Sequence, residues 1–129
     1  MGWLTRLLGS LAKPTERVRR AAGEPGSAAE VVAELMRRYR AANDDGWVHL
    51  EAVGEGRRVI VQVKHDVLNV LLEELPAHAG EALGLERIET GLYRMADGSP
   101  EGVAATIDAL LNVHFGLGAE YAVEGRVEG

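Results

Sequence analysis

Residues 47–64, WVHLEAVGEGRRVIVQVK, indicate the fold more clearly than any other stretch of the chain. Two runs rich in β-branched residues, 47–53 and 57–64, alternate side chains in the way that half-buried strands do. The sequence Gly-Glu-Gly at 54–56 separates them, which predicts a hairpin with a three-residue loop. The alternation assigns one set of side chains to one face of each strand: Val48, Leu50 and Ala52 in the first, and Val59, Val61 and Val63 in the second.

A helix is predicted on each side of this hairpin along the chain. Ser27 and Glu30 have the spacing of a capping box, in which each side chain satisfies a free backbone N–H at the start of a helix. Ser99 as N-cap and Pro100 at the first helical position begin the second helix, and Gly116 ends it. Apolar residues recur at helical spacing in both segments: Val31, Val32, Leu35, Met36 and Tyr39 in the first, and Val103, Ile107, Leu110, Leu111 and Phe115 in the second.

Residues 66–83, DVLNVLLEELPAHAGEAL, are compatible with two structures. Their leucines and glutamates favour a helix that Asp66 would cap, and this is the interpretation we prefer. The apolar residues at alternate positions from Leu68 to Leu72 also fit a third strand, in which case Pro76 would open a short helix after it.

The remaining strands are predicted at 85–96, as one strand or a tight pair around Gly91, and at 119–128, where polar and apolar residues alternate. From Ser27 onward the expected order of elements is α-β-β-α-β-α-β. This order predicts an α+β fold, in which one antiparallel sheet carries helices on one face and an amphipathic N-terminal helix precedes the whole.

The first 22 residues differ from the rest of the chain in charge and pattern. Five basic residues stand against Glu16 alone, so residues 1–22 have a net charge of +4; because the whole chain carries −6, residues 23–129 carry −10. Beyond Pro14, residues 15–23 (TERVRRAAG) predict a second short, basic turn of helix. The basic residues are Arg6, Lys13, Arg17, Arg19 and Arg20. The apolar residues that share one helical face are Trp3, Leu4, Leu7, Leu8 and Leu11.

These differences divide the chain into three parts. Residues 1–22 form a docking segment, residues 23–27 (GEPGS) a linker, and residues 27–129 the α+β domain. The apolar stripe of the docking segment is too small to fill a core, so it needs another surface to cover it. We expect that surface to be a membrane or a groove on a partner protein, and an ordinary helix packed on the same domain is the alternative.

The sequence contains no recognisable catalytic or cofactor-binding motif. It has no cysteine, and two of its three serines, Ser27 and Ser99, are expected to be helix caps. The glycine pairs at 54–56 and 116–118 lack the third glycine and the following helix of a dinucleotide fingerprint, so we interpret them as turns. None of the histidines has a spacing that would bring two imidazoles together on a metal: His49, His65, His78 and His114. We therefore expect no enzymatic activity, no metal and no cofactor.

Three segments together resemble a known group of proteins: the hairpin, LGLERIETGLYRM at 83–95, and the helix SPEGVAATIDALLNVHFG at 99–116. Their order and hydrophobic pattern are similar to those of small bacterial chaperone-like domains of the YbjN and type III secretion chaperone class. The resemblance covers residues 27–116. It implies an opening helix, a twisted antiparallel sheet, a long closing helix and no catalysis. It also implies that a sheet edge or an apolar groove captures a segment of a partner protein, usually in a dimer.

The expected function is protein binding or assembly. The expected partner is another protein or a larger complex, and contact with a membrane surface and a homodimer are also compatible with the sequence. Nucleic acid is not expected, because the pI is near 5.2. Without cysteines or an apolar run of about 20 residues, the chain is expected in the cytoplasm, free or at the cytoplasmic face of a membrane. The alternative function is a small-molecule binder or enzyme with a pocket between sheet and helices.

Overall fold

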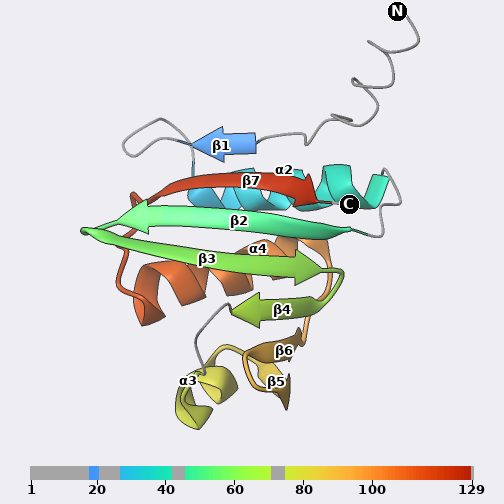
Figure 1. Cartoon of the computed structure of the whole chain (residues 1–129), viewed down its shortest axis with the longest axis vertical. Coiled ribbons are helices and arrows are strands. Elements are labelled where there is room, and N and C mark those ends of the chain that lie inside the picture. Colours follow the sequence, from blue (N-terminus) through green and yellow to red (C-terminus); the bar gives the residue numbers. More distant parts are fainter. Residues whose placement is uncertain (1–17, 21–26, 42–45, 71–74, 129) are drawn as a thin grey trace, which may run out of the picture.

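The computed structural model describes residues 18–20, 27–41, 46–70 and 75–128 (Figure 1). Seven strands form one sheet in the order β1-β7-β2-β3-β4-β6-β5, and the pairing throughout is antiparallel. The strands are β1 (Val18–Arg20), β2 (Trp47–Gly54), β3 (Arg57–Lys64), β4 (Val67–Val70), β5 (Leu85–Glu89), β6 (Leu92–Met95) and β7 (Ala122–Glu128). The helices are α2 (Ala28–Ala41), α3 (Ala77–Ala82) and α4 (Pro100–Ala109), and a π-helical turn (Leu110–His114) extends α4.

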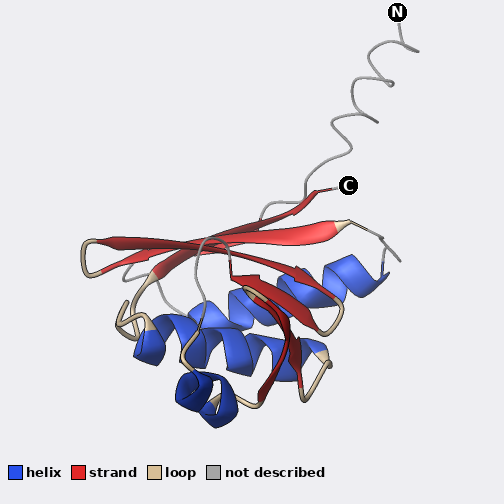
Figure 2. Ribbon diagram, turned by 60° about the horizontal axis from the view of Figure 1, so that its bottom comes forward, coloured by secondary structure: helices blue, strands red, loops and turns tan. Residues whose placement is uncertain are grey.

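The three helices lie on one face of the sheet, which confirms the predicted α+β architecture (Figure 2). Helix α2 packs against α4 and against β7, while α3 contacts β5. The buried apolar side chains lie between the sheet and these helices. We call the opposite face of the sheet, which carries no helix among the described residues, the open face.

The β2–β3 hairpin forms as predicted, with a shorter loop. Gly54 pairs with Arg57, so the turn contains only Glu55 and Gly56 instead of three residues. Both turn residues have positive φ, 49° and 75°, as expected for a tight turn that follows the twist of the strands. All six side chains assigned to one face of the hairpin are buried, which confirms the alternation.

The preferred interpretation of residues 66–83 is wrong at 67–70, where a strand replaces the expected helix. β4 pairs with β3 on one side and with β6 on the other, so Leu68 lies opposite both Val63 and Tyr93. Two strand partners satisfy the backbone of β4, and this outweighs the helical preference of its residues. Asp66 is part of the turn before β4 and does not cap a helix. The alternative is confirmed: helix α3 begins directly after Pro76.

The second basic turn of helix, expected at 15–23, is wrong at Val18–Arg20. These residues form β1, which pairs with β7. A very short isolated helix is unstable, whereas a segment of this length gains ladder hydrogen bonds from a neighbouring strand. The helix predicted over residues 3–11 and linker residues 23–26 lie outside the described residues.

Helix α4 begins as predicted. The Ser99 hydroxyl accepts a hydrogen bond from the Gly102 amide at 3.0 Å, and Asp97 accepts one from the Ser99 amide at 2.9 Å. After Ala109 the helix widens into the π-helical turn, in which the Phe115 amide donates to the Leu110 carbonyl at 2.9 Å. The residues that follow this turn contact the β2–β3 hairpin: a Cβ added at Gly54, the last residue of β2, would lie 2.4 Å from the Leu117 carbonyl oxygen.

The carboxylate of Asp97 makes stability depend on pH. Hydrogen bonds from the Ser99 amide and hydroxyl lower the pKa of Asp97 below its usual value of 3.8. Because the pKa is lower in the folded state, the ionised carboxylate stabilises that state at pH values above the usual pKa of aspartate. This contribution is lost as the pH falls through the folded-state pKa. We therefore expect Asp97→Asn to be less stable than the wild type near neutral pH, with the difference shrinking below about pH 4. Urea unfolding from pH 3 to 7 measures this, and a difference that stays constant over that range would contradict it.

Candidate functional site

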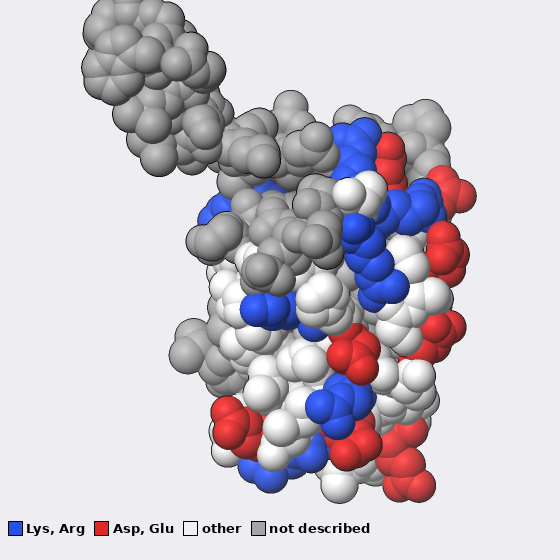
Figure 3. Space-filling model, turned by 90° about the vertical axis from the view of Figure 1, so that its right-hand side faces the viewer, with Lys and Arg blue, Asp and Glu red and all other residues white. Residues whose placement is uncertain are grey.

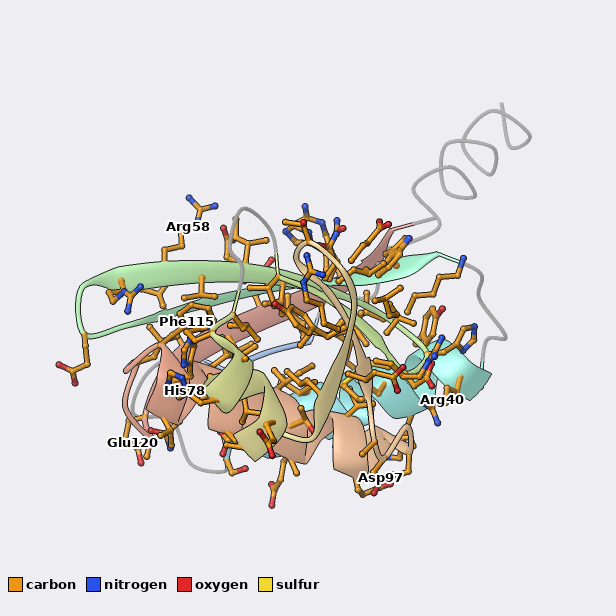
Figure 4. All side chains as sticks on the ribbon, turned by 90° about the horizontal axis from the view of Figure 1, so that it is seen from below. Arg40, Arg58, His78, Asp97, Phe115 and Glu120 are labelled. Atoms are coloured by element: carbon orange, nitrogen blue, oxygen red, sulfur yellow. The ribbon has the colours of Figure 1, made fainter. Side chains whose placement is uncertain are left out.

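The open face carries a mixture of charged and apolar side chains. They alternate with the buried residues of the core along β2, β3, β4 and β6. Arg58 on β3 forms an ion pair with Glu51 on β2. Figure 4 shows Arg58 on the open face and Arg40 and Asp97 on the side of the helices. Because this ion pair neutralises part of the charge on the face, apolar contact is the more distinctive property that the face offers to a ligand.

An apolar hollow of about 310 Å³ lies at one end of this face, and we call it the Trp47 hollow. Four neighbouring strands contribute to its lining: β2, β3 and β4 where they meet at one end of the sheet, and β6 through Leu92, which pairs with Asn69. Lys64 of β3 pairs with Val67 of β4. Val48 of β2 pairs with Val63 of β3, so the preceding residue, Trp47, lies beside Lys64. The lining consists of Trp47, Val67 and Leu92, which are apolar and partly exposed, and of Lys64, His65 and Asp66.

The turn between β3 and β4 forms the polar rim of the hollow. His65 has a φ of 54°, a left-handed conformation that histidine adopts more readily than most residues, and its ring lies 5.6 Å from that of Tyr39. The Asp66 carbonyl accepts a hydrogen bond from the Met95 amide at 2.7 Å, and the Asp66 carboxylate lies 3.7 Å from Nε of Arg94. Contacts with α2 and β6 therefore hold the rim in place. Figure 3 shows this end of the molecule, where both signs of charge are mixed with uncharged surface.

A second hollow of about 360 Å³ lies between α3 and the β5–β6 pair. It is the place where the alternative function, a small-molecule site between sheet and helices, could be located. Two of its polar side chains contact neighbouring residues: the Tyr93 hydroxyl accepts a hydrogen bond from the Leu75 amide at 2.8 Å, and Arg87 donates one to Thr90. The remaining lining is Pro76, Ala77, Gly80, Glu81 and Leu85. These contacts do not direct a set of polar groups toward one ligand.

The two edges of the sheet are poorly suited to the addition of a partner strand. On the edge strand β5, Glu86, Arg87 and Glu89 are exposed, and a bulge between Arg87 and Glu89 shifts its register with β6. Charges and bulges on an edge strand hinder pairing with another chain. The opposite edge, β1, comprises three residues in the described part of the chain. The open face is therefore a better surface than either edge for contact with a polypeptide.

Most of the predicted docking residues lie outside the described residues. Arg19 and Arg20 are described: they belong to β1, where their partners on β7 are Glu124 and Val123. The residues outside the description are Trp3, Leu4, Arg6, Leu7, Leu8, Leu11, Lys13 and Arg17.

Sequence reasoning missed the Trp47 hollow. One signal for it was present, because Trp47 occupies the same phase of the strand alternation as His49 and Glu51, which is the phase of the open face. A tryptophan in the outward phase of a strand is a candidate contact residue. The sequence gives no comparable signal for the rest of the lining, because it favours a helix, not a strand, at Val67.

No family model matches the chain, and neither a curated protein nor a solved structure does. Among the described residues, no group of three or more histidine, aspartate or glutamate side chains is placed to hold a metal ion. The helices in the described part of the chain are also too short or too polar to cross a membrane.

Proposed function

We propose that this protein is a non-enzymatic binding or assembly protein of the chaperone-like kind, which docks on a partner protein or a membrane surface through its N-terminal segment. The observation that carries the proposal is the contrast within the chain: residues 1–17, which precede β1, contain an apolar stripe and have a net charge of +2, whereas residues 18–129 have a net charge of −8. An amphipathic, basic segment is suited to a surface that is apolar and anionic. In this proposal the protein works in the cytoplasm, free or at the cytoplasmic face of a membrane, and as a monomer or a homodimer.

The described domain supports binding as the function in two ways. The Trp47 hollow presents a partly exposed tryptophan on an apolar floor, and tryptophan is enriched among residues that dominate the energy of protein interfaces. In the second hollow, the Tyr93 hydroxyl and Arg87 already form hydrogen bonds with neighbouring residues, which makes a small-molecule site there less favourable. Protein binding is therefore favoured over the enzymatic alternative.

Replacing Leu7 and Leu8 together by serine is expected to release the protein from its target. Burying each leucine contributes roughly 1.5–3 kcal/mol, so the double variant should bind at least about a hundredfold more weakly. Co-sedimentation with two kinds of vesicle tests whether the target is a membrane. One kind contains only neutral lipid, and the other contains neutral and anionic lipid. Raising the salt concentration should weaken attachment, because basic residues near an anionic surface are screened.

The matched control is Val113→Ser, which removes an exposed apolar side chain from the domain itself, where Val113 is 76 % exposed. It should leave attachment unchanged. The proposed function is wrong if the wild type binds neither kind of vesicle and captures the same proteins as the Leu7→Ser/Leu8→Ser variant.

A further inference from the structure

We propose that the Trp47 hollow is an intramolecular docking site for the apolar stripe of residues 3–11 of the same chain. The inference goes beyond the proposed function, because it concerns the protein in the absence of any target. The hollow suits an apolar occupant, since most of its exposed lining surface is apolar and Trp47, Val67 and Leu92 belong to it. The stripe needs an apolar surface to cover it, as the sequence pattern shows.

The direction of β1 places the start of that strand toward the hollow. Val18 pairs with Gly125 of β7, which in turn pairs with Leu50 of β2, so β1 and β2 run in the same direction. Trp47 is the first residue of β2, three residues before Leu50. β1 therefore starts toward the same end of the sheet as β2 (Figure 1), and Trp47 lies at that end.

The length of chain before β1 is sufficient to reach the hollow. β2, β3 and β4 lie two, three and four positions from β1 in the sheet, which corresponds to about 10–19 Å at roughly 4.8 Å per strand. The six residues 12–17 can span about 20 Å when extended. Residues 3–11 would add about 14 Å as a helix, comparable to the width of three strands. The stripe can therefore cover the hollow without any change in the sheet.

The charges of the two surfaces are compatible with this contact. Arg6 is the one charged residue of the stripe, and the carboxylate of Asp66 lies on the rim of the hollow with 44 % of its side chain exposed. The lining also contains Lys64, and Arg94 lies beside Asp66, so the apolar side chains are expected to contribute most of the contact. Docking on the domain and docking on an external target would use the same leucines. A target therefore competes with the hollow, and binding of the segment elsewhere uncovers Trp47.

The two tryptophans of the chain allow a direct test, since one lies in the segment and the other in the hollow. In the Trp3→Phe variant, Trp47 is the only tryptophan, and quenching of its fluorescence by acrylamide reports whether the hollow is covered. Adding Leu7→Ser and Leu8→Ser should lower the ratio of docked to free segment at least about a hundredfold, so that quenching of Trp47 increases. Val113→Ser in the same Trp3→Phe background is the control and should leave quenching unchanged.

A reciprocal variant tests the other side of the contact. In Trp47→Phe the remaining probe is Trp3, and adding Leu92→Ser should make Trp3 as accessible to acrylamide as a free tryptophan derivative.

Equal quenching of Trp47 with and without the two leucine changes would overturn the proposal. Protection that depends on protein concentration and accompanies dimers in sedimentation would also overturn it, because the occupant would then be a second copy. Loss of the cooperative unfolding transition in the Leu7→Ser/Leu8→Ser variant would overturn it as well, since the segment would then belong to the core. The experiment contains no lipid or partner, so its failure is distinguishable from failure of the proposed function.

Discussion

Leu111→Ala is expected to lower the free energy of unfolding by roughly 2–5 kcal/mol. Leu111 has no exposed surface and lies in the π-helical turn at the end of α4, on the face that packs into the core. Truncation would remove buried methyl groups and leave a cavity that the surrounding side chains fill only in part. The Leu111 carbonyl also accepts a hydrogen bond from the Leu117 amide at 3.0 Å, so its backbone helps to fix the chain that leads into β7. Urea denaturation followed by circular dichroism measures the change.

Val113→Ala is the matched control, because Val113 lies in the same turn but is 76 % exposed. It should change stability by less than about 0.5 kcal/mol, as most surface substitutions do. Similar values for the two variants would contradict the assignment of Leu111 to the inner face.

Gly125→Val is expected to cost about 3 kcal/mol, at the upper end of the range for overpacked cores. Gly125 lies in the middle of β7, with α2 packed against this strand. A Cβ added at Gly125 would lie 2.1 Å from Cδ2 of Leu35 and 2.7 Å from Cδ2 of Leu50. Both leucines are buried and closely surrounded, so α2 would have to move away from the sheet. The higher strand propensity of valine cannot compensate for such a displacement.

The series Gly125→Ala and Gly125→Val should show increasing destabilisation in thermal and urea unfolding. Gly80→Ala is the control glycine, because an added Cβ there meets nothing nearer than the Leu85 carbonyl oxygen at 3.9 Å. Since Gly80 lies within α3, alanine should be neutral or stabilising by about 0.5–1 kcal/mol. A Gly125→Val variant as stable as the wild type would show that α2 does not pack on β7 as the structure describes.

The sequence predicts the β2–β3 hairpin and α4 correctly because their signals are local. Alternating β-branched residues and a glycine turn specify the hairpin, and the Ser99–Pro100 pair specifies the start of α4. Nearby residues supply most of the favourable interactions in these elements. Their predicted buried faces are therefore also correct, from Val48 in β2 to Phe115 after α4.

Residues 67–70 show where local preference fails. Leucine and glutamate around this segment favour a helix, but β3 and β6 offer hydrogen bonds on both of its sides. β6 is more than 20 residues later in the sequence, so no local pattern reveals that it will be a neighbour. The same reason explains Val18–Arg20, whose strand exists only because β7 lies beside it.

The candidate site also has one part that the sequence reveals and one that depends on the tertiary structure. The apolar stripe and basic charge of the docking segment are properties of consecutive residues, so the chain alone reveals them. The Trp47 hollow requires β2, β3, β4 and β6 to be neighbours, and that depends on the order of strands in the sheet.

Gly125 shows the difference at a single position. The alternation of Tyr121, Val123 and Gly125 already assigns this residue to the inner face of its strand. The need for a glycine there arises only when Leu35 of α2 and Leu50 of β2 meet above it. Periodicity along the chain tells which side chains turn inward, because it depends on the geometry of one strand or helix. Which of them must be small depends on distant segments that compete for the same volume, and this is settled only when the helices pack on the sheet.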